Sequence, residues 1–307
     1  MICILYVTLV GALLGIAGLF LERALPADYP RRWIWAAVIP LSVFLPGYYR
    51  THHNASVTDT NPLTVLDPTW WIRLDSYDGI IERAWLIASV LLILWAITNA
   101  FRVSYLLRSS SRIGQDTATA MVDGVPIVVT DSLGPATVGV WHSRVLVPRW
   151  VLTLPRTDRR YVLRHEDEHR KAHDARLLFV ASLALILMPW NVALWWNLRR
   201  LRLAVEMDCD NRVVNGLGDA NAYGHMLLKV AQATSRGPRL QPALLGGVGM
   251  LERRLTVLLA PTPLRHIQKF LLPAVAIALL LLVFSMPHPV LTTTNTSHGT
   301  MTHTAQR

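Results

Sequence analysis

The residues with the clearest chemical potential are two histidines four positions apart, His165 and His169, with Glu166 directly after the first. On a helix, side chains at positions i and i+4 lie on one face, so both imidazoles could bind one metal ion. Glu166 would then stand where it could accept a proton from a water activated by that metal. Three protein ligands would leave one position of a tetrahedral zinc ion open for water or substrate. The spacing predicts a hydrolytic zinc centre with Glu166 as its general base.

Glu206 and Asp210 supply the remaining parts of such a centre. They lie four residues apart in a segment without Gly or Pro, residues 201–214, so both carboxylates would project from one face of a helix. Glu206 is the candidate third ligand, beside His165 and His169, and Asp210 is the candidate carboxylate partner of a ligand imidazole. An isolated H-E-x-x-H string also arises by chance, so the paired spacing is what favours a zinc site.

The composition indicates that this centre belongs to an integral membrane protein. The 307 residues are 52% hydrophobic with a mean hydropathy of +0.34. Each of four apolar runs is about the length needed to cross roughly 30 Å of hydrocarbon as a helix. We therefore expect four transmembrane helices, at residues 2–21, 33–49, 84–100 and 270–286. The second would be kinked by Pro40 and Pro46. The first lacks a preceding basic region, so we expect it to be retained and not removed as a signal peptide.

The distribution of arginine and lysine predicts the orientation. The short link at residues 22–32 holds three arginines, whereas the longer loop at residues 50–83 has one arginine between its ends. Basic loops stay in the cytoplasm, so residues 22–32 and 101–269 should face it. The protein would then be a multi-pass protein of the inner (cytoplasmic) membrane. This topology accounts for the formal charge of +10. No nucleic-acid partner is expected, because the arginine pairs are scattered without interleaved aromatic residues.

A fifth apolar run, residues 177–198, lies between His169 and Glu206. As one straight membrane helix it would carry the chain about 30 Å and separate Glu206 from the histidines. Pro189-Trp190-Asn191 interrupts the run, and arginines flank both of its ends. We therefore expect a helical hairpin at residues 177–198 that enters the membrane or lies on its surface. The alternative is a buried helix pair in a soluble domain.

Residues 119–148 are rich in β-branched residues and turn signals and predict a small sheet before the metal helix. Asp123-Gly124 predicts a hairpin turn between residues 121–122 and 127–129, and two further strands are expected at residues 138–140 and 145–147. The sheet is a candidate for docking an extended substrate. Tyr223 and His225 are candidate oxyanion donors, although packing is the simpler role for the tyrosine.

The two cysteines predict neither a disulfide nor a cysteine-based zinc site. Cys3 would lie near the outer face and Cys209 in the cytoplasmic domain, so a bilayer would separate them. Cys209 is expected to be a small buried apolar residue between Glu206 and Asp210.

Taken together, the motifs resemble a known family, the BlaR/MecR-type integral membrane zinc metallopeptidases. The similarity covers nearly the whole chain up to Met286. It is carried by Pro135-x-x-x-Gly139, Val145-Leu146-Val147-Pro148, Leu163-Arg164-His165-Glu166-x-x-His169-x-x-x-x-Asp174, the Pro-Trp-Asn break and Glu206-x-x-Cys209-Asp210. The resemblance implies His165, His169 and Glu206 as zinc ligands, Glu166 as the base and Asp210 as the partner of a ligand. One departure is Ser143, where the family commonly has proline.

The resemblance also implies a domain order. Residues 1–101 would form a membrane region with three transmembrane helices, and residues 102–267 a cytoplasmic α+β peptidase domain of the zincin (gluzincin) type. Residues 268–286 would form the fourth transmembrane helix, and residues 287–307 a short extracytoplasmic tail. That tail is polar and expected to be disordered. A penicillin-binding sensor domain, which the antibiotic-sensing members carry after the fourth span, is not expected in 21 residues.

The expected function is zinc-dependent endoproteolysis of a cytoplasmic protein in a signalling pathway. By resemblance the substrate would be a transcriptional repressor or the peptidase itself. Two alternatives stay open. One is a membrane scaffold or signal transducer that keeps the zinc for structure, against which an intact Glu166 argues. The other is a general membrane quality-control protease with the same chemistry.

Overall fold

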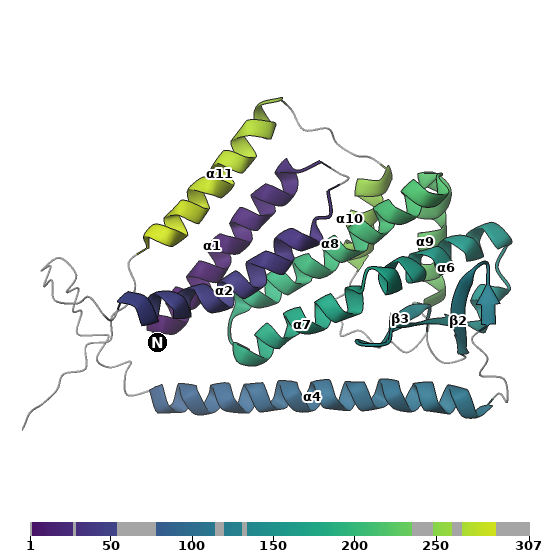
Figure 1. The fold of residues 1–307 in the computed structure, drawn as a ribbon, viewed down its shortest axis with the longest axis horizontal. Coiled ribbons are helices and arrows are strands. Elements are labelled where there is room, and N and C mark those ends of the chain that lie inside the picture. The colour runs from purple at the N-terminus through teal and green to yellow at the C-terminus, as the bar shows by residue number, and fades with distance from the viewer. Residues whose placement is uncertain are drawn as a thin grey trace, which may run out of the picture.

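The protein is mainly α-helical, with one small sheet. The computed structural model describes residues 2–26, 29–53, 78–113, 120–130, 134–234, 248–259 and 266–286. Long helices form a bundle at one end, the sheet with shorter helices forms the other end, and the helix Asp78–Ile113 runs alongside both (Figure 1). The expected tail at residues 287–307 and most of the loop at residues 50–83 lie outside the described residues.

The bundle consists of α1 (Ile2–Ala24), α2 (Arg32–His53), α4 (Asp78–Ile113) and α11 (His266–Ser285). Within the described residues, three helices are long and apolar enough to cross a membrane, at Ile4–Ala24, Gly79–Arg102 and Ile267–Ser285. They indicate a multi-pass membrane protein. Three of the four expected spans are thus present as candidates. The fourth, α2, continues as a helix through Pro40 and Pro46, but its apolar part is only the shorter Arg32–Pro46.

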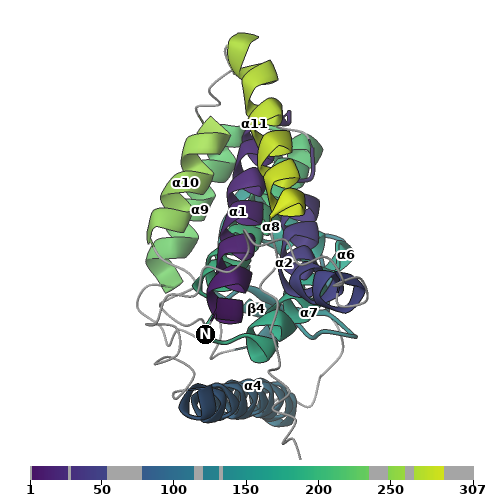
Figure 2. The ribbon, with the colours of Figure 1, turned by 90° about the vertical axis from the view of Figure 1, so that its left-hand side faces the viewer.

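The expected hairpin is present as a pair of helices. α7 (Asp174–Leu187) and α8 (Val192–Leu217) are separated at the Pro-Trp-Asn break, where the Asn191 side chain caps α8 by accepting a hydrogen bond from the backbone N–H of Leu194. α8 packs against α1 and α2, and α7 packs against α2. α4 lies apart from the other bundle helices (Figure 2) and contacts α7, where Trp85 Nε1 donates to the backbone oxygen of Leu187.

Glycines on α1 allow this close packing. A Cβ on Gly15 would lie 2.4 Å from Asn197 Oδ1 and 2.6 Å from the Trp196 ring, so any larger residue would push α8 away. A Cβ on Gly11 would lie 3.3 Å from the Cβ of Ala193. Helices that approach through glycine in this way are typical of membrane bundles.

The sheet has the strand order β1-β2-β4-β3, built from β1 (Ala120–Val122), β2 (Val125–Thr130), β3 (Ala136–Val138) and β4 (Arg144–Pro148). The predicted hairpin turn is confirmed, because Asp123 and Gly124 both have positive φ and β1 pairs antiparallel with β2. β2 and β4 pair in parallel, and β3 is an edge strand antiparallel to β4. β3 ends at Val138, two residues earlier than expected.

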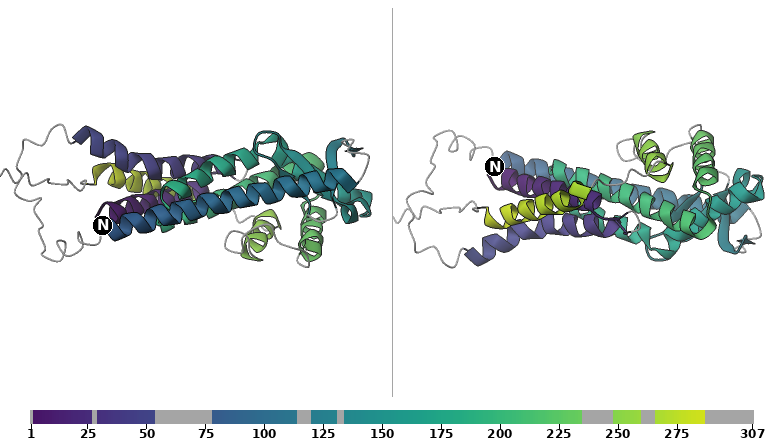
Figure 3. Two further views of the ribbon diagram at one scale, coloured as in Figure 1. Left: turned by 90° about the horizontal axis from the view of Figure 1, so that it is seen from below. Right: turned by 90° about the horizontal axis from the view of Figure 1, so that it is seen from above.

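Four further helices lie in the described residues: the short α5 (Arg149–Leu152), α6 (Arg156–Lys171), α9 (Ala220–Thr234) and α10 (Val248–Leu259). α9 and α10 stand to one side of the long axis (Figure 3). The described residues form two apolar cores, one among the bundle helices and one between the sheet, α6 and α9. α8 contributes to both, with Leu201 in the first and Val213 in the second. Glu206 therefore lies at the junction between the cores.

Candidate metal centre

Two helices bring the predicted residues together. α6 carries His165, Glu166 and His169, and α8 carries Glu206 and Asp210. α6 begins after Pro155, a residue suited to the start of a helix, and ends at Lys171, with Ala172 as its C-cap. His173 then takes the left-handed conformation with φ of 55° and turns the chain into α7, so Asp174 returns toward His169.

The two imidazoles face each other through their Nε2 atoms, which lie 3.2 Å apart. The Glu206 carboxylate faces the same point, with Oε2 3.6 Å from His165 Nε2 and Oε1 3.8 Å from His169 Nε2. In a tetrahedral zinc site, two ligand atoms each 2.0–2.1 Å from the metal lie about 3.3 Å apart. The histidine separation matches this value, and the carboxylate needs to move by only a few tenths of an ångström.

The opposite edge of each imidazole is held by a hydrogen-bond partner. His169 Nδ1 donates to Asp174 Oδ2 at 2.8 Å. Tyr223 donates its hydroxyl to Asp210 Oδ1 at 2.7 Å, so its oxygen accepts from His165 Nδ1 at 2.8 Å. This network places the proton of each ring on Nδ1 and leaves a lone pair on each Nε2. Three lone-pair donors, one of them anionic, therefore converge on one point, and such a site fits a divalent cation.

The pKa values of His165, His169 and Glu206 also indicate that the site favours a bound positive charge. Burial lowers the pKa of His165, but Cys209 and Glu206 outweigh it and raise that pKa from 6.5 to about 10. Burial likewise opposes charge on His169, yet Cys209 and Asp174 raise its pKa well above the usual value. Burial raises the pKa of Glu206, but Arg254 and the two histidines hold it well below its usual range. Without a metal, protons on the imidazoles balance the carboxylate.

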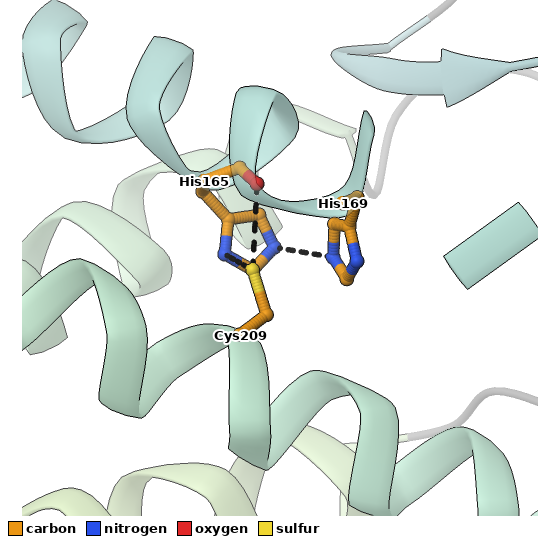
Figure 4. A group of neighbouring side chains, drawn as sticks. All are labelled: His165, His169 and Cys209. Atoms are coloured by element: carbon orange, nitrogen blue, oxygen red, sulfur yellow. Dashed lines mark hydrogen bonds between the residues drawn. The ribbon is translucent and has the colours of Figure 1, made fainter. Parts of the chain in front are cut away.

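Cys209 makes contacts at the centre that the sequence did not predict. It is fully buried, as expected, but its thiol does not simply pack among apolar groups. Among the described residues, donor atoms of His165, His169 and Cys209 form a group that lies within 4.8 Å of one another (Figure 4). The sulfur lies 3.3 Å from His165 Nδ1, and the thiol donates to the His165 backbone oxygen at 3.4 Å. Burial raises its pKa, but the two histidines lower it below the ordinary value.

The position of the sulfur separates its role from that of Glu206. It contacts the Nδ1 edge of His165, which the Tyr223 hydroxyl also contacts, whereas Glu206 faces the Nε2 atoms of both rings. The rings as oriented thus favour Glu206 as the third ligand. The expectation that no cysteine would take part in the centre is nevertheless too simple, because a thiolate is a strong zinc ligand and the Cys209 sulfur lies within 4.8 Å of a donor atom of each histidine.

Glu166 lies at the edge of the sheet. It is buried on α6, and the Thr137 hydroxyl of β3 lies 2.6 Å from its backbone oxygen and 3.1 Å from its Oε2. The hydroxyl has one proton, so it can donate to only one of these acceptors at a time. Thr137 therefore ties the candidate base to the edge strand, a connection that the sequence did not predict.

Asp210 takes a different position from the one predicted. Its Oδ1 lies 3.7 Å from His165 Nδ1, too far for a hydrogen bond, because the Tyr223 hydroxyl lies between them. Arg254 of α10 donates two bonds to Asp210, at 2.8 and 2.6 Å, and its Nη1 lies 2.9 Å from Glu206 Oε2. The direct carboxylate partner of a ligand imidazole is Asp174. His225, the other candidate oxyanion donor, is exposed on α9.

Asp174 and Asp208 tie the centre to the start of α2. Arg32 Nη1 donates to Asp174 Oδ1 at 2.7 Å, and Arg212 lies 3.4 Å from Asp174 Oδ2. Asp208 accepts from the backbone N–H groups of Arg31 and Arg32, each at 3.0 Å. The first turn of α2 is thereby held against the start of α7 through Asp174 and against α8 through Asp208.

Comparison with known proteins gives one match. A family model described as BlaR1 peptidase M56 covers residues 7–258, which include every residue of the centre described above. No curated protein and no solved structure matches the chain.

Proposed function

Because the chain belongs to the BlaR1-type M56 peptidase family, we propose that it is a membrane-embedded zinc endopeptidase with His165, His169 and Glu206 as ligands and Glu166 as base. The observation that carries the proposal is the convergence of two imidazole Nε2 atoms and one carboxylate, with Nε2 atoms 3.2 Å apart. That donor set and spacing suit zinc with three protein ligands, the arrangement of catalytic sites.

Bound zinc would supply Lewis acidity, which lowers the pKa of a water and polarises the scissile carbonyl. Glu166 takes the proton of the attacking water and returns it to the leaving amine. Thr137 holds the Glu166 carboxylate next to β3. Asp174 and Tyr223 keep the two imidazoles in the tautomer and orientation that binding requires. Arg254 balances the charge of Glu206 and Asp210, so two carboxylates can share a mostly buried site.

An extended peptide would dock along β3. This strand is at the edge of the sheet, and Thr137 in its middle contacts the base. A peptide that pairs with the edge of β3 that no described strand occupies would present its backbone beside Glu166 through main-chain hydrogen bonds. The substrate class is thus a protein with an accessible extended segment, in the cytoplasm, such as a transcriptional repressor or another copy of this chain.

The topology belongs to the same proposal. α1, α2, α4 and α11 would all cross the membrane, with residues 102–267 as a cytoplasmic peptidase domain around the α7–α8 hairpin. The course of these four helices supports this assignment, because the C-terminal ends of α1 and α4 and the N-terminal ends of α2 and α11 lie on the side of the sheet and α6 (Figure 1). Arginines at the ends of α1 and α2 on that side agree with a cytoplasmic location.

A second candidate function rests on Cys209. If this thiolate bound zinc together with both histidines and Glu206, four protein ligands would close the site, as in structural zinc centres. The protein would then be a scaffold or signal transducer. Glu166, held by Thr137 beside the histidines, would have no role in such a site, which is why we prefer the peptidase.

The experiment that tests the peptidase compares cellular proteomes after expression of the wild type and Glu166→Ala at equal levels. We expect new protein N-termini, at one or a few sites, in cells with the wild type alone. Identical N-termini in both samples, with zinc present in the purified wild type, would favour the scaffold. Many unrelated cleavage sites would instead indicate a quality-control protease.

A further inference from the structure

An exposed tryptophan lies beside the edge strand of the sheet. Trp141, in the connection between β3 and β4, is 71% exposed. The connection is tightly built, because Gly139 has φ of 106° and a Cβ there would lie 2.5 Å from the His142 backbone oxygen. Arg176 of α7 lies near the Val140 and Trp141 backbone oxygens, each at 3.4 Å, and its guanidinium lies 5.3 Å from the Trp141 ring. The large apolar side chain of Trp141 is thus exposed to the surroundings on a turn with a defined conformation.

Trp141 lies beside the N-terminal end of a stripe of exposed apolar residues on α7. Arg176 and four apolar residues recur at helical spacing within about 100° of the helix circumference. The apolar residues are Phe179, Val180, Leu183 and Leu187, each between 41% and 57% exposed. The opposite face of α7 packs into the core shared by α1, α2 and α8. The stripe therefore continues the outer surface of the bundle toward the hairpin tip.

The contact between α8 and α1 indicates how deep the tip of the α7–α8 hairpin would lie in a membrane. The residues after the tip contact α1 at Gly11, which lies 13 residues before the end of the Ile4–Ala24 span. At about 1.5 Å per residue this distance is about 20 Å, more than half of a hydrocarbon core of roughly 30 Å. If α1 crosses the membrane, the α7 stripe contacts lipid chains.

A comparison with Trp33 indicates the level of Trp141 relative to the membrane surface. Trp33, at the start of α2, is 53% exposed and lies 5.3 Å from the Arg32 guanidinium, the same pairing that Trp141 makes with Arg176. Arg32 also donates to Asp174, two residues before Arg176. The two pairs thus lie at one level, at the end of a bundle helix. Arginine and tryptophan at such a level are typical of the membrane–water interface, where the ring enters and the charge stays in water.

We propose that Trp141 and the α7 stripe contact the bilayer and hold β3 at the membrane surface. Thr137 of β3 lies four residues before Trp141 and contacts Glu166. A peptide that pairs with β3 would then lie at the level of the lipid headgroups. This inference rests on the proposed function and narrows it: the preferred substrate is a segment of a membrane-attached protein close to its anchor, and not a freely diffusing one.

Depth-dependent fluorescence quenching tests the membrane contact without any turnover. Single cysteines replace His142, Leu187 or Met121 in a Cys3→Ser background, and each full-length protein is labelled with bimane and reconstituted in phosphatidylcholine–phosphatidylglycerol vesicles. Met121 is the matched control, because it is 68% exposed but lies on β1 at the far edge of the sheet. Cys209 is fully buried, and the Cys3→Ser protein without a new cysteine measures any label that it takes up.

We expect nitroxides at the headgroup level to quench the label at position 142 several-fold more than the label at 121. Nitroxides in the middle of the acyl chain should quench position 187 most. Adding Trp141→Ser should remove the quenching at 142 and leave that at 187. Equal quenching at 142 and 121, or no effect of Trp141→Ser, would overturn the anchor even if peptidase activity is present.

A second measurement addresses the substrate. The peptide that spans the cleavage site found in the proteome comparison is offered to the vesicles in free form and with a palmitoyl anchor. Trp141→Ser should raise KM several-fold for the anchored peptide at unchanged kcat and should not alter cleavage of the free peptide. Equal KM values for the two peptides with the wild type would contradict the narrowed substrate class and leave the peptidase itself intact.

Discussion

At the residue scale, the proposed zinc ion and the protons on the two imidazoles would compete for the same nitrogen lone pairs. Cys209 and Glu206 raise the pKa of the buried His165 to about 10, and Cys209 and Asp174 raise the pKa of His169. A metal must displace these protons before it binds. In the metal-free protein, the stabilisation from protonated His165 is fully present below about pH 6.5 and is lost as the pH rises through about 10.

Zinc affinity should therefore rise with pH. Between about pH 6.5 and 10 we expect the apparent association constant to increase up to about tenfold per pH unit for each proton displaced. Titration calorimetry of chelator-treated protein, in buffers of different ionisation enthalpy, counts the protons released. An affinity that does not vary with pH would mean that the imidazoles are already neutral in the empty site.

Replacement of the base separates chemistry from metal binding. Glu166→Gln keeps the size of the side chain and touches no ligand, so zinc content should stay at the level of the wild type. Loss of general-base assistance should reduce the cleavage rate by about 10² to 10⁴-fold. Elemental analysis and peptide cleavage are measured on the same preparation, with His169→Ala as the control that loses the metal. Near-normal turnover by metal-loaded Glu166→Gln would contradict the mechanism.

The third ligand can be identified with cobalt in place of zinc. If Glu206 binds the metal, Glu206→Ala should weaken cobalt binding strongly, and Cys209→Ser should leave the visible spectrum almost unchanged. A thiolate ligand would instead give an intense near-ultraviolet charge-transfer band that Cys209→Ser abolishes. That second result would support the four-ligand scaffold.

The residues of the candidate site could be predicted from the sequence where two of them lie within one turn of the same helix. His165 with His169, and Glu206 with Asp210, are pairs at i and i+4, and helix geometry alone places each pair on one face. Tyr223 and Arg254 could not be assigned in this way, because their contacts depend on how α9 and α10 fold back onto α8. Asp174 follows His169 by five residues, but only the left-handed His173 turns it toward the ring. Sequence spacing gave no signal for that turn.

At the element scale, α8 connects the membrane bundle to the metal centre. Its first half packs against α1, and its second half carries Glu206 and lies in the core under the sheet. A displacement of α8 at the bundle would therefore move Glu206, the proposed third ligand. The prediction of a hairpin at residues 177–198 depended on the same logic, since one zinc requires both flanks of the run to lie on one side.

Gly15→Ala tests this connection. The new Cβ would lie 2.4 Å from Asn197 Oδ1 and 2.6 Å from the Trp196 ring, and such overpacking typically costs about 1–3 kcal/mol. We expect a lower melting temperature in detergent and weaker zinc retention. The matched control is Gly79→Ala in α4, where a Cβ would meet nothing within 4 Å. Equal behaviour of the two variants would show that α8 does not depend on the α1 contact.

The predictions for membrane helices were less complete. Long uncharged runs identified α1, α4 and α11, because a span needs little more than length and apolar character. α2 follows another pattern. Two backbone N–H groups at its start donate to Asp208. This helix therefore attaches the bundle to the metal centre, in addition to packing in the bundle core. Hydropathy cannot reveal such contacts between segments 176 residues apart.

At the scale of the whole molecule, the arrangement makes sense only if both flanks of the α7–α8 hairpin lie on one side of the membrane. α6 and the second half of α8 share one core, and the hairpin tip lies beside the middle of α1. The positive charge of the chain is concentrated between α4 and α11. These features together predict a single orientation, in which the metal centre faces the cytoplasm at the membrane surface.

Cysteine labelling in intact cells tests that orientation. Cysteines at Ser109 and Gly218 should be protected from an impermeant thiol reagent added outside, and cysteines at Thr58 and Thr293 should react with it. A membrane-permeant reagent should label all four positions and serves as the control for reactivity. Labelling at 109 and 218 with protection at 58 and 293 would reverse the orientation and place the centre outside. Labelling at 218 with protection at 109 would mean that residues 177–198 cross the membrane. Glu206 could not then share a metal ion with His165 and His169, because about 30 Å of hydrocarbon would separate them.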